Sequence, residues 1–350
     1  MARSDASHRN VLVVRLSALG DVAMTIPVLY PVCRAHPDTR FVMLTRKWPA
    51  SMFHDRPDNL KVVGIDTKDY KGFLGMMRLA RELRQQYDID AVADLHSVLR
   101  TWMLGTCMRW HGIPVARLDK QRDRRKALIH HKAGEPITPT HERYREVFQQ
   151  LGLDAPVHGF TRLFDGKPIP TSLMVLDKQP GQHWVAISPF SAHKGKVYPL
   201  PLMEQVVAQL SSRENYQIFL MGGGKDEKTA LGKIARQYPH VLSLAEVKHG
   251  FLDEYALLSQ CDLMVTMDSA NMHLASLVGL EALTIWGATA PACGFLGYGQ
   301  DASTDLQLDM ECRPCSIYGE RDCRYGDYRC LSGISPERVV ERIVSRVEKK

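Results

Sequence analysis

Four loops that follow apolar, strand-like runs carry side chains able to do chemistry. In the first, VVRLSALGDVAMTIPVL at 13–29, Asp21 comes directly after Gly20. A carboxylate there can act as a general base, or it can accept backbone N–H bonds at a helix start as an N-cap. The two roles are compatible, because capping leaves one oxygen free. The turn has one glycine where a dinucleotide fingerprint has three, so we expect no pyrophosphate here.

The second and third loops offer groups that suit a nucleotide sugar. In ISPFSAHKGKVYPLP at 187–201, the Ser191 hydroxyl and Lys196 ammonium precede a predicted helix, which suits a phosphate. A solvated basic loop is the alternative. In FLMGGGKDEKTA at 219–230, three glycines permit close backbone approach to a ligand. Glu227 could then accept a bond from a sugar or ribose hydroxyl, or simply cap the helix.

The fourth loop lies in MVTMDSANMHLASLVG at 264–279. A buried strand ends at Asp268, Ser269 and Ala270, and a helix of small residues starts at once. Such a helix start leaves its N–H groups open to an anion. His273 follows about one turn later, where a binding role and a purely structural role both stay open.

Two groups of residues raise the question of a metal. Cys312, Cys315, Cys323 and Cys330 are spaced C-x2-C-x7-C-x6-C. The first pair fits half of a structural zinc site, but the second pair matches neither a ribbon nor a finger. Reduced packing thiols are the alternative, and disulfides are disfavoured in the cytosol. Asp88-Ile89-Asp90 could hold a divalent metal under a nucleotide diphosphate, but we interpret it as a turn, because a helix gives way to a strand there.

The elements that must position these loops alternate between strand and helix. Strands are predicted at 10–16, 40–45, 61–66, 90–96, 184–190, 216–223, 262–267 and 280–287, and helices at 22–36, 72–86, 202–213, 228–238, 254–261, 271–279 and 335–350. This pattern predicts an α/β fold with two doubly wound, Rossmann-like domains. A break near 155–182 separates them, giving domains at 1–170 and 182–335 and a C-terminal helix at 336–350. Ligands are expected at the carboxyl ends of the strands, in a cleft between the domains.

Composition indicates a soluble protein with a basic first half. The 350 residues are 45% hydrophobic and 24% charged, and no apolar run approaches the length of a membrane span. The N-terminus lacks the apolar region of a secretory signal, so we expect a cytoplasmic protein. Residues 1–160 hold 25 Lys and Arg against 17 Asp and Glu. This excess peaks at 117–132, which favours a polyanion or an anionic membrane surface; a solvated basic loop is the alternative.

Together these stretches resemble the bacterial lipopolysaccharide heptosyltransferases of glycosyltransferase family 9. The resemblance rests on RLSALGDVAMTIPVL, SPFSAHKGKVYP and MDSANMHLASLVGL, and on the cysteine-bearing tail CRPCSIYGERDCRYGDYRCLSGISPERV. It implies the two-domain arrangement called GT-B, with ADP-heptose bound by the C-terminal domain and the acceptor sugar by the N-terminal domain.

The resemblance also implies roles for individual residues. The catalytic aspartate would be Asp21. The donor-binding residues would be Ser191, Lys196, Glu227, Asp268, Ser269, Ala270 and His273. Ala270 stands where the family usually has glycine, and Ala192 where a second hydroxyl often lies. Both departures leave backbone contacts open and put side-chain contacts in doubt.

The predicted activity is therefore transfer of heptose from ADP-heptose to the lipopolysaccharide inner core. An inverting transfer needs a base for the acceptor hydroxyl and positive charge on the leaving diphosphate. Asp21 would supply the first, and Lys196 with the helix start at 268–273 the second, so no cofactor is required. The basic segment would face the lipid A-linked acceptor and the inner face of the cytoplasmic membrane, with four cations as its acceptor-binding residues: Arg122, Arg124, Arg125 and Lys126.

Three alternatives follow from the same residues. Another nucleotide sugar could be the donor, onto another surface glycan. A nucleotide-dependent oxidoreductase is disfavoured by the missing glycine fingerprint. Nucleic-acid binding is disfavoured because aromatic residues do not interleave with the basic run.

Overall fold

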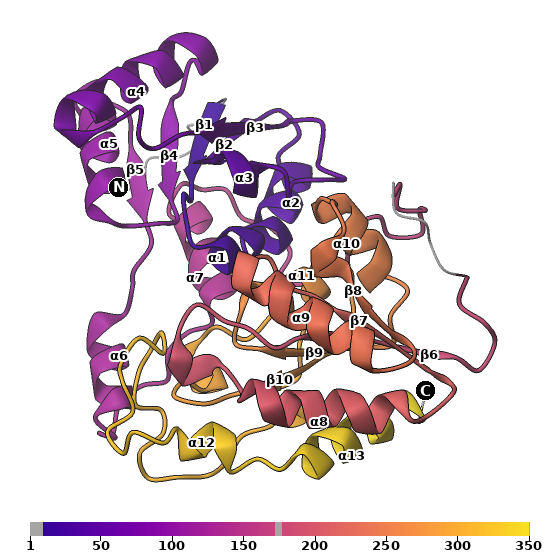
Figure 1. Cartoon of the computed structure of the whole chain (residues 1–350). Coiled ribbons are helices and arrows are strands. Elements are labelled where there is room, and N and C mark those ends of the chain that lie inside the picture. The colour runs from indigo at the N-terminus through magenta and orange to yellow at the C-terminus, as the bar shows by residue number, and fades with distance from the viewer. Residues whose placement is uncertain (1–9, 172–176, 350) are drawn as a thin grey trace. The chain divides into compact units, whose positions relative to one another are not determined.

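The computed structural model describes residues 10–171 and 177–349, and these form two compact units. Unit 1 comprises the described residues up to Lys120 together with Thr138–Asp165. Unit 2 comprises Gln121–Ile137 and the described residues from Gly166 onward. Each unit contains one five-stranded sheet in which all strand pairs are parallel. The predicted α/β class with two doubly wound sheets is therefore confirmed (Figure 1).

Unit 1 is built around β1, the central strand of its sheet. Its strands are β1 (Asn10–Val14), β2 (Arg40–Arg46), β3 (Leu60–Ile65), β4 (Ala91–Asp94) and β5 (Val115–Arg117), in the order β3-β2-β1-β4-β5. Its helices are α1 (Leu19–Ala23), α2 (Ile26–Ala35), α3 (Lys47–Ala50), α4 (Gly72–Tyr87), α5 (Leu99–Arg109) and α7 (Thr140–Gln149). The order reverses at β1, whose neighbours are β2 and β4, so the loops after these strands meet at one edge of the sheet.

Both faces of the unit 1 sheet are covered. Leu12 and Val14 of β1 pack with Met76 of α4 and Leu104 of α5 in one apolar cluster. Since side chains alternate along a strand, Val11 and Val13 lie on the opposite face, and they are fully buried. The strand is therefore buried on both sides, as its unbroken apolar sequence predicts.

Unit 2 repeats the plan with β6 and β9 at its centre. Its strands are β6 (His183–Ser188), β7 (Tyr216–Leu220), β8 (Val241–Ser243), β9 (Leu263–Met267) and β10 (Ala282–Ile285), in the order β10-β9-β6-β7-β8. Its α-helices are α6 (Arg122–Ile129), α8 (Leu200–Ser211), α9 (Lys225–Gln237), α10 (Phe251–Leu258), α11 (Ala270–Leu277), α12 (Arg329–Ser332) and α13 (Pro336–Val347). Its 3-10 helices are η1 (Lys194–Lys196), η2 (Leu244–Glu246), η3 (Pro291–Cys293) and η4 (Ala302–Thr304). β6 pairs with β9 so that Ser188 lies opposite Thr266, which places the loops after these two strands side by side.

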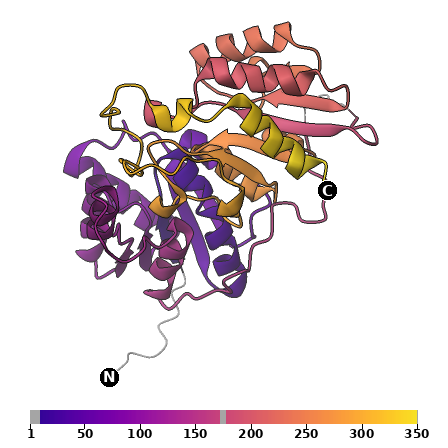
Figure 2. The ribbon, with the colours of Figure 1, turned by 90° about the horizontal axis from the view of Figure 1, so that it is seen from below.

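The C-terminal helix α13 is part of the unit 2 core. Val339 and Ile343 are fully buried against the sheet residues Val185 and Val265. The Tyr198 hydroxyl donates to the Ile334 carbonyl oxygen at 2.7 Å, just before the helix. Figures 1 and 2 show α13, in yellow, within this unit.

Unit boundaries differ from the expected domains in three places. Residues 121–137, which contain most of the basic segment 117–132, cluster with unit 2, as do residues 166–170, and helix α13 belongs to unit 2 as well. Apolar contacts explain the first difference, because Ile137 is buried with Cys293 and Ile317, and Leu128 packs against them. Within the described residues, no helix combines the length and apolar character needed to cross a membrane.

Candidate functional site

Asp21 lies in the short helix α1, just beyond the carboxyl end of β1. It occupies the third position of that helix, and its Oδ2 accepts the backbone N–H of Ala18 at 3.1 Å. The expected N-cap position is therefore wrong by three residues: Ala18 is the cap residue, and Asp21 closes the turn from inside the helix. The expectation that this carboxylate accepts an N–H bond at the helix start is met.

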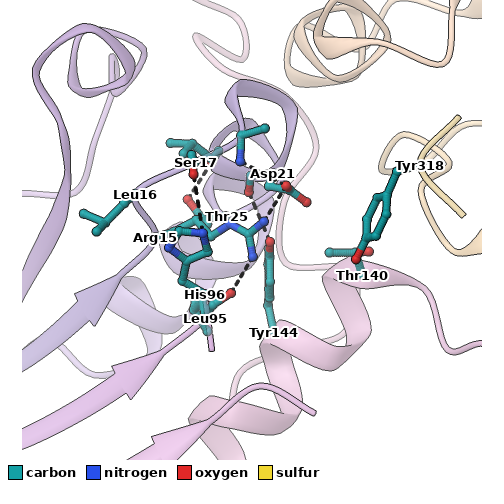
Figure 3. Close-up of polar contacts among 12 residues, drawn as sticks. Arg15, Leu16, Ser17, Asp21, Thr25, Leu95, His96, Thr140, Tyr144 and Tyr318 are labelled. Atoms are coloured by element: carbon teal, nitrogen blue, oxygen red, sulfur yellow. Dashed lines mark hydrogen bonds and ion pairs between the residues drawn. The ribbon is translucent and has the colours of Figure 1, made fainter. Parts of the chain in front are cut away.

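Arg15, the residue after β1, is the ionic partner of Asp21. Its guanidinium forms an ion pair with Asp21 Oδ2 and donates to the Leu95 carbonyl oxygen at 2.7 Å (Figure 3). The Arg15 guanidinium also lies 5.8 Å from the ring centroid of Tyr144, whose hydroxyl donates to the Asp21 carbonyl oxygen at 3.3 Å. Arg15 is buried, whereas the Asp21 side chain keeps 22% of its surface exposed. The carboxylate is thus held in place and still accessible.

His96 lies beside this pair, after β4. Its Nε2 is 3.4 Å from the Ser17 Oγ, and its backbone N–H donates to Asp94 Oδ1 at 3.1 Å. Burial, followed by the positive charge of Arg15, lowers the pKa of the imidazole to about 3. The ring is therefore neutral at physiological pH, so one ring nitrogen is a hydrogen-bond acceptor.

In unit 2 the loops after β6 and β9 bring together Ser191, Lys196 and Asp268. The Ser191 hydroxyl donates to the Asp268 carbonyl oxygen at 2.8 Å, and Lys196 Nζ lies 3.3 Å from Asp268 Oδ2. The same Oδ2 accepts the Thr289 hydroxyl at 2.9 Å. Asp268 is buried, and its carboxylate pairs with the lysine. The three residues assigned to donor binding thus lie close together, and their role in donor binding stays a prediction.

The start of α11 has open backbone donors. Ser269 is the N-cap residue, but its side chain makes no capping bond, and its hydroxyl is 3.1 Å from that of Thr266. Asn271 in the first turn donates its amide to the Ser188 hydroxyl. A helix start whose N–H groups lack a side-chain cap is suited to an anion. His273 is buried in this helix.

Glu227 serves as the helix-capping acid of the glycine turn. Its Oε2 accepts the N–H groups of Gly223 at 2.7 Å and Gly224 at 3.2 Å, at the start of α9. Because Oε2 takes both bonds, Oε1 stays available for a hydroxyl group. The capping interpretation is met, and the ligand role stays a prediction.

The predicted acceptor-binding cations divide into two pairs. Arg124 pairs with Glu135, and Arg125 contacts the Tyr318 hydroxyl and lies 5.6 Å from the Phe295 ring centroid. Glu135 belongs to the loop that follows α6, whereas the Arg125 contacts join α6 to a distant part of its unit. Arg122 and Lys126 are exposed on the same helix.

The four clustered cysteines line one cavity of about 380 Å³ in unit 2. Burial raises the pKa of Cys330 to about 11. Within the described ranges, no three His, Cys, Asp or Glu side chains are arranged so that they could hold a metal ion. As placed, the thiols do not form a zinc centre, and the predicted zinc stays a prediction. In the Asp-x-Asp pair, Asp88 caps α4 in the left-handed region and Asp90 accepts the Asn10 N–H, as a turn requires.

The sequence did not indicate five residues that lie beside the candidate site residues. Arg15, His96 and Tyr144 are near Asp21 in unit 1, and Asn271 and Thr289 are near Asp268 in unit 2. Arg15 falls inside the strand predicted at 10–16, although an arginine near the end of an otherwise apolar run is a usable signal. His96 follows a buried strand in the same way as Asp268. Tyr144 and Thr289 are far in sequence from the residues that they contact, so spacing carried no signal for them.

Comparison with known proteins finds relatives along nearly the whole chain. Lipopolysaccharide heptosyltransferase 1 of Pseudomonas aeruginosa is 25% identical over 95% of this chain and 96% of its own. Lipopolysaccharide heptosyltransferase 3 of Escherichia coli is 24% identical over 77% of this chain and 81% of its own.

Solved structures agree on the fold. A family 9 glycosyl transferase from Veillonella parvula has a TM-score of 0.71 at 18% identity and covers 98% of both chains. The E. coli heptosyltransferase WaaC, solved with ADP, has a TM-score of 0.68 at 18% identity, over 96% of this chain and 99% of its own. The sequence pattern of "Glycosyltransferase family 9 (heptosyltransferase)" matches residues 76–325. The chain belongs to this family and is a glycosyltransferase.

Proposed function

We propose that this enzyme transfers heptose from ADP-heptose to the inner core of lipopolysaccharide, with inversion at the anomeric carbon and Asp21 as the general base. The observation that carries the proposal is the pairing of Asp21 with Arg15 at the end of the central strand of unit 1. The names of the curated relatives support the acceptor. WaaC has been solved with ADP and with ADP-2-deoxy-2-fluoro heptose, which supports the donor.

The environment of Asp21 suits a base. An adjacent guanidinium favours the ionised form of a carboxyl group, which is the form that accepts a proton. Asp21 Oδ2 is occupied by Arg15 and the Ala18 N–H. In the proposed step Asp21 removes the proton of the acceptor hydroxyl as its oxygen bonds to the anomeric carbon and the bond to the ADP oxygen breaks.

Leaving-group stabilisation is assigned to unit 2. ADP departs with added negative charge on its terminal phosphate, so donors aimed at that oxygen lower the barrier. Lys196 and the open N–H groups at the start of α11 supply such donors, and Ser191 holds the two loops together. Glu227 Oε1 is proposed to accept a ribose or sugar hydroxyl.

Acceptor recognition is assigned in part to the basic helix α6. The exposed Arg122 and Lys126 are proposed to contact phosphate groups of the acceptor, while Arg124 pairs with Glu135 and Arg125 holds the helix to Tyr318 of unit 2. Because this acceptor is carried on lipid A, the enzyme is proposed to work at the cytoplasmic face of the membrane.

A structural zinc ion in the tail is retained as a separate proposal. Its support is the convergence of Cys312, Cys315, Cys323 and Cys330 on one cavity. Binding would require these side chains to rotate toward one another. Elemental analysis of the purified protein tests this, with about one zinc per chain expected and a zinc-free folded protein as the contrary result.

A thermal-shift screen of ADP-, GDP- and UDP-linked sugars tests the donor assignment. The proposal expects stabilisation by ADP-heptose and ADP, because a ligand that binds only the folded state raises the melting temperature. Stabilisation by GDP- or UDP-linked sugars alone would point instead to transfer of another sugar onto another surface glycan.

A further inference from the structure

An apolar surface on helix α4 is a feature of unit 1 that the proposed chemistry does not use. Four residues define it, here called the α4 surface: Phe73, Leu74, Met77 and Trp110. Their side chains are 37%, 79%, 41% and 63% exposed, respectively. The Phe73 and Trp110 rings are in edge contact, with centroids 5.5 Å apart. Since Phe73, Leu74 and Met77 share one side of the helix, the residues form one patch.

The core does not account for this exposure. Helix α4 is amphipathic, and Met76, Leu79 and Leu83 already bury its inner side against the sheet and α5. The outer side would be expected to be polar. Instead a leucine and a methionine project from it, beside a tryptophan that follows α5. Clustered exposed apolar residues of this kind mark an interaction site.

Cations outnumber acids on the helix that carries the patch. Lys71 precedes α4, and the helix carries Arg78, Arg81 and Arg84 against a single acid, Glu82. Arg78 is 3.6 Å from Glu82. Among the described residues, Lys71 and Arg81 form no ion pair, and both are exposed. A partner protein would have to neutralise these cations during burial, whereas an anionic lipid surface offers phosphates around the rim and acyl chains beneath the apolar residues.

We propose that the α4 surface docks on an anionic lipid bilayer. Leucine, phenylalanine and methionine would enter the boundary between headgroups and acyl chains, and Trp110 would lie at headgroup level. Lys71 and Arg81 would contact lipid phosphates. The inference rests on the proposed function, since an enzyme acting on a lipid-linked acceptor must work at a membrane.

Sedimentation with lipid vesicles tests the docking without substrate. Wild-type protein should bind vesicles of equal parts phosphatidylglycerol and phosphatidylcholine, bind phosphatidylcholine alone much less, and detach at high salt. Leu74→Ser should lower the partition coefficient by about tenfold. Leu242→Ser, which changes a 45% exposed leucine in unit 2, should leave the partition coefficient unchanged.

A charge pair provides the second control. Lys71→Gln should weaken binding to the anionic vesicles, and Lys233→Gln, on an exposed site of α9, should not. Equal binding by wild type and Leu74→Ser overturns the proposal. A second result also overturns it: sedimentation equilibrium shows a dimer for the wild type and a monomer for Leu74→Ser. The α4 surface would then be an interface between two copies of the chain.

The test separates this inference from the proposed function. Leu74→Ser should retain wild-type transfer to a deacylated, soluble acceptor. If the wild type binds vesicles but transfers no heptose, the docking proposal stands and the proposed function is wrong. If it transfers heptose but does not bind vesicles, the proposed function stands and the docking proposal is wrong.

Discussion

The guanidinium of Arg15 and the carboxylate of Asp21 form an ion pair at the carboxyl end of β1. Arg15 is fixed by the Leu95 carbonyl oxygen and by the face of Tyr144, so the arginine is rigid and the acid is held through it. This arrangement makes Arg15 a positioning residue for Asp21, and it gives the base a charge environment that substitution can alter.

Replacing Arg15 should lower the rate of transfer without changing donor binding. Loss of the guanidinium removes an ionic partner that holds the Asp21 carboxylate in position. In Arg15→Met kcat should therefore fall about tenfold or more, while the Kd for ADP stays at the wild-type value. Arg34→Met removes an exposed arginine from α2 and is the matched control. A wild-type kcat in Arg15→Met would contradict the positioning role.

Lys196 should contribute to donor binding far more than its neighbour Lys194. A charge-assisted hydrogen bond to a diphosphate is worth about 1.5–3 kcal/mol, so Lys196→Ala should weaken ADP binding by about tenfold or more. Lys194 is exposed, and Lys194→Ala should bind ADP like wild type. Titration calorimetry measures both. Equal ADP affinity in the two variants would show that Lys196 does not contribute to donor binding.

Gly195 should tolerate no side chain. A Cβ at this position would lie 2.9 Å from the Ala288 Cβ and 3.0 Å from the Gly319 carbonyl oxygen. Gly195→Ala should therefore lower the free energy of unfolding by about 1–3 kcal/mol and disturb the adjacent lysine. At Gly223 a Cβ would meet no atom within 4 Å, so Gly223→Ala is the control. Matching melting temperatures for the two variants would show that the packing at Gly195 can yield.

Asp305 should make stability depend on pH. Burial raises the pKa of this carboxyl group from 3.8 to about 7 in the folded state. The folded state then holds the proton more tightly than the unfolded state, so this group lowers stability as pH rises from about 4 to about 7. Asp305→Asn should stabilise the protein near pH 7 by about 1 kcal/mol or more, with little difference near pH 4.

Denaturant unfolding at both pH values checks the Asp305 prediction. Asp309→Asn, at an exposed position four residues later, provides the control. If Asp305→Asn instead loses stability at pH 7, the carboxylate is ionised and favourably bound in the folded protein.

The fold could be predicted from the sequence because both sheets are parallel and each is buried on both faces. The central strands are continuous apolar runs, and reactive side chains follow them directly, so Asp21, Ser191 and Asp268 could be found by inspection. Their partners could not. Tyr144 and Thr289 reach the site only through tertiary packing, which a single sequence does not encode at any fixed spacing.

The basic segment shows the same limit. Its charge was evident, but residues 121–137 join unit 2 through burial of Ile137 with Cys293 and Ile317, more than 150 residues away in the chain. Likewise, the sequence did not indicate the α4 surface, because the spacing of apolar residues in an amphipathic helix does not show which of them are buried in the core. Exposure of Leu74 is visible only once the helix is packed.

Asp21→Asn tests the central claim most directly. The amide keeps the size of the side chain and cannot accept the acceptor's proton. Heptosyl transfer from ADP-heptose should fall by about 10²-fold or more, while the Kd for ADP stays at the wild-type value because the proposed donor contacts lie in unit 2. His96→Gln, assayed beside it, should retain more activity than Asp21→Asn. Transfer by Asp21→Asn at a rate close to wild type would contradict the assignment of Asp21 as the base.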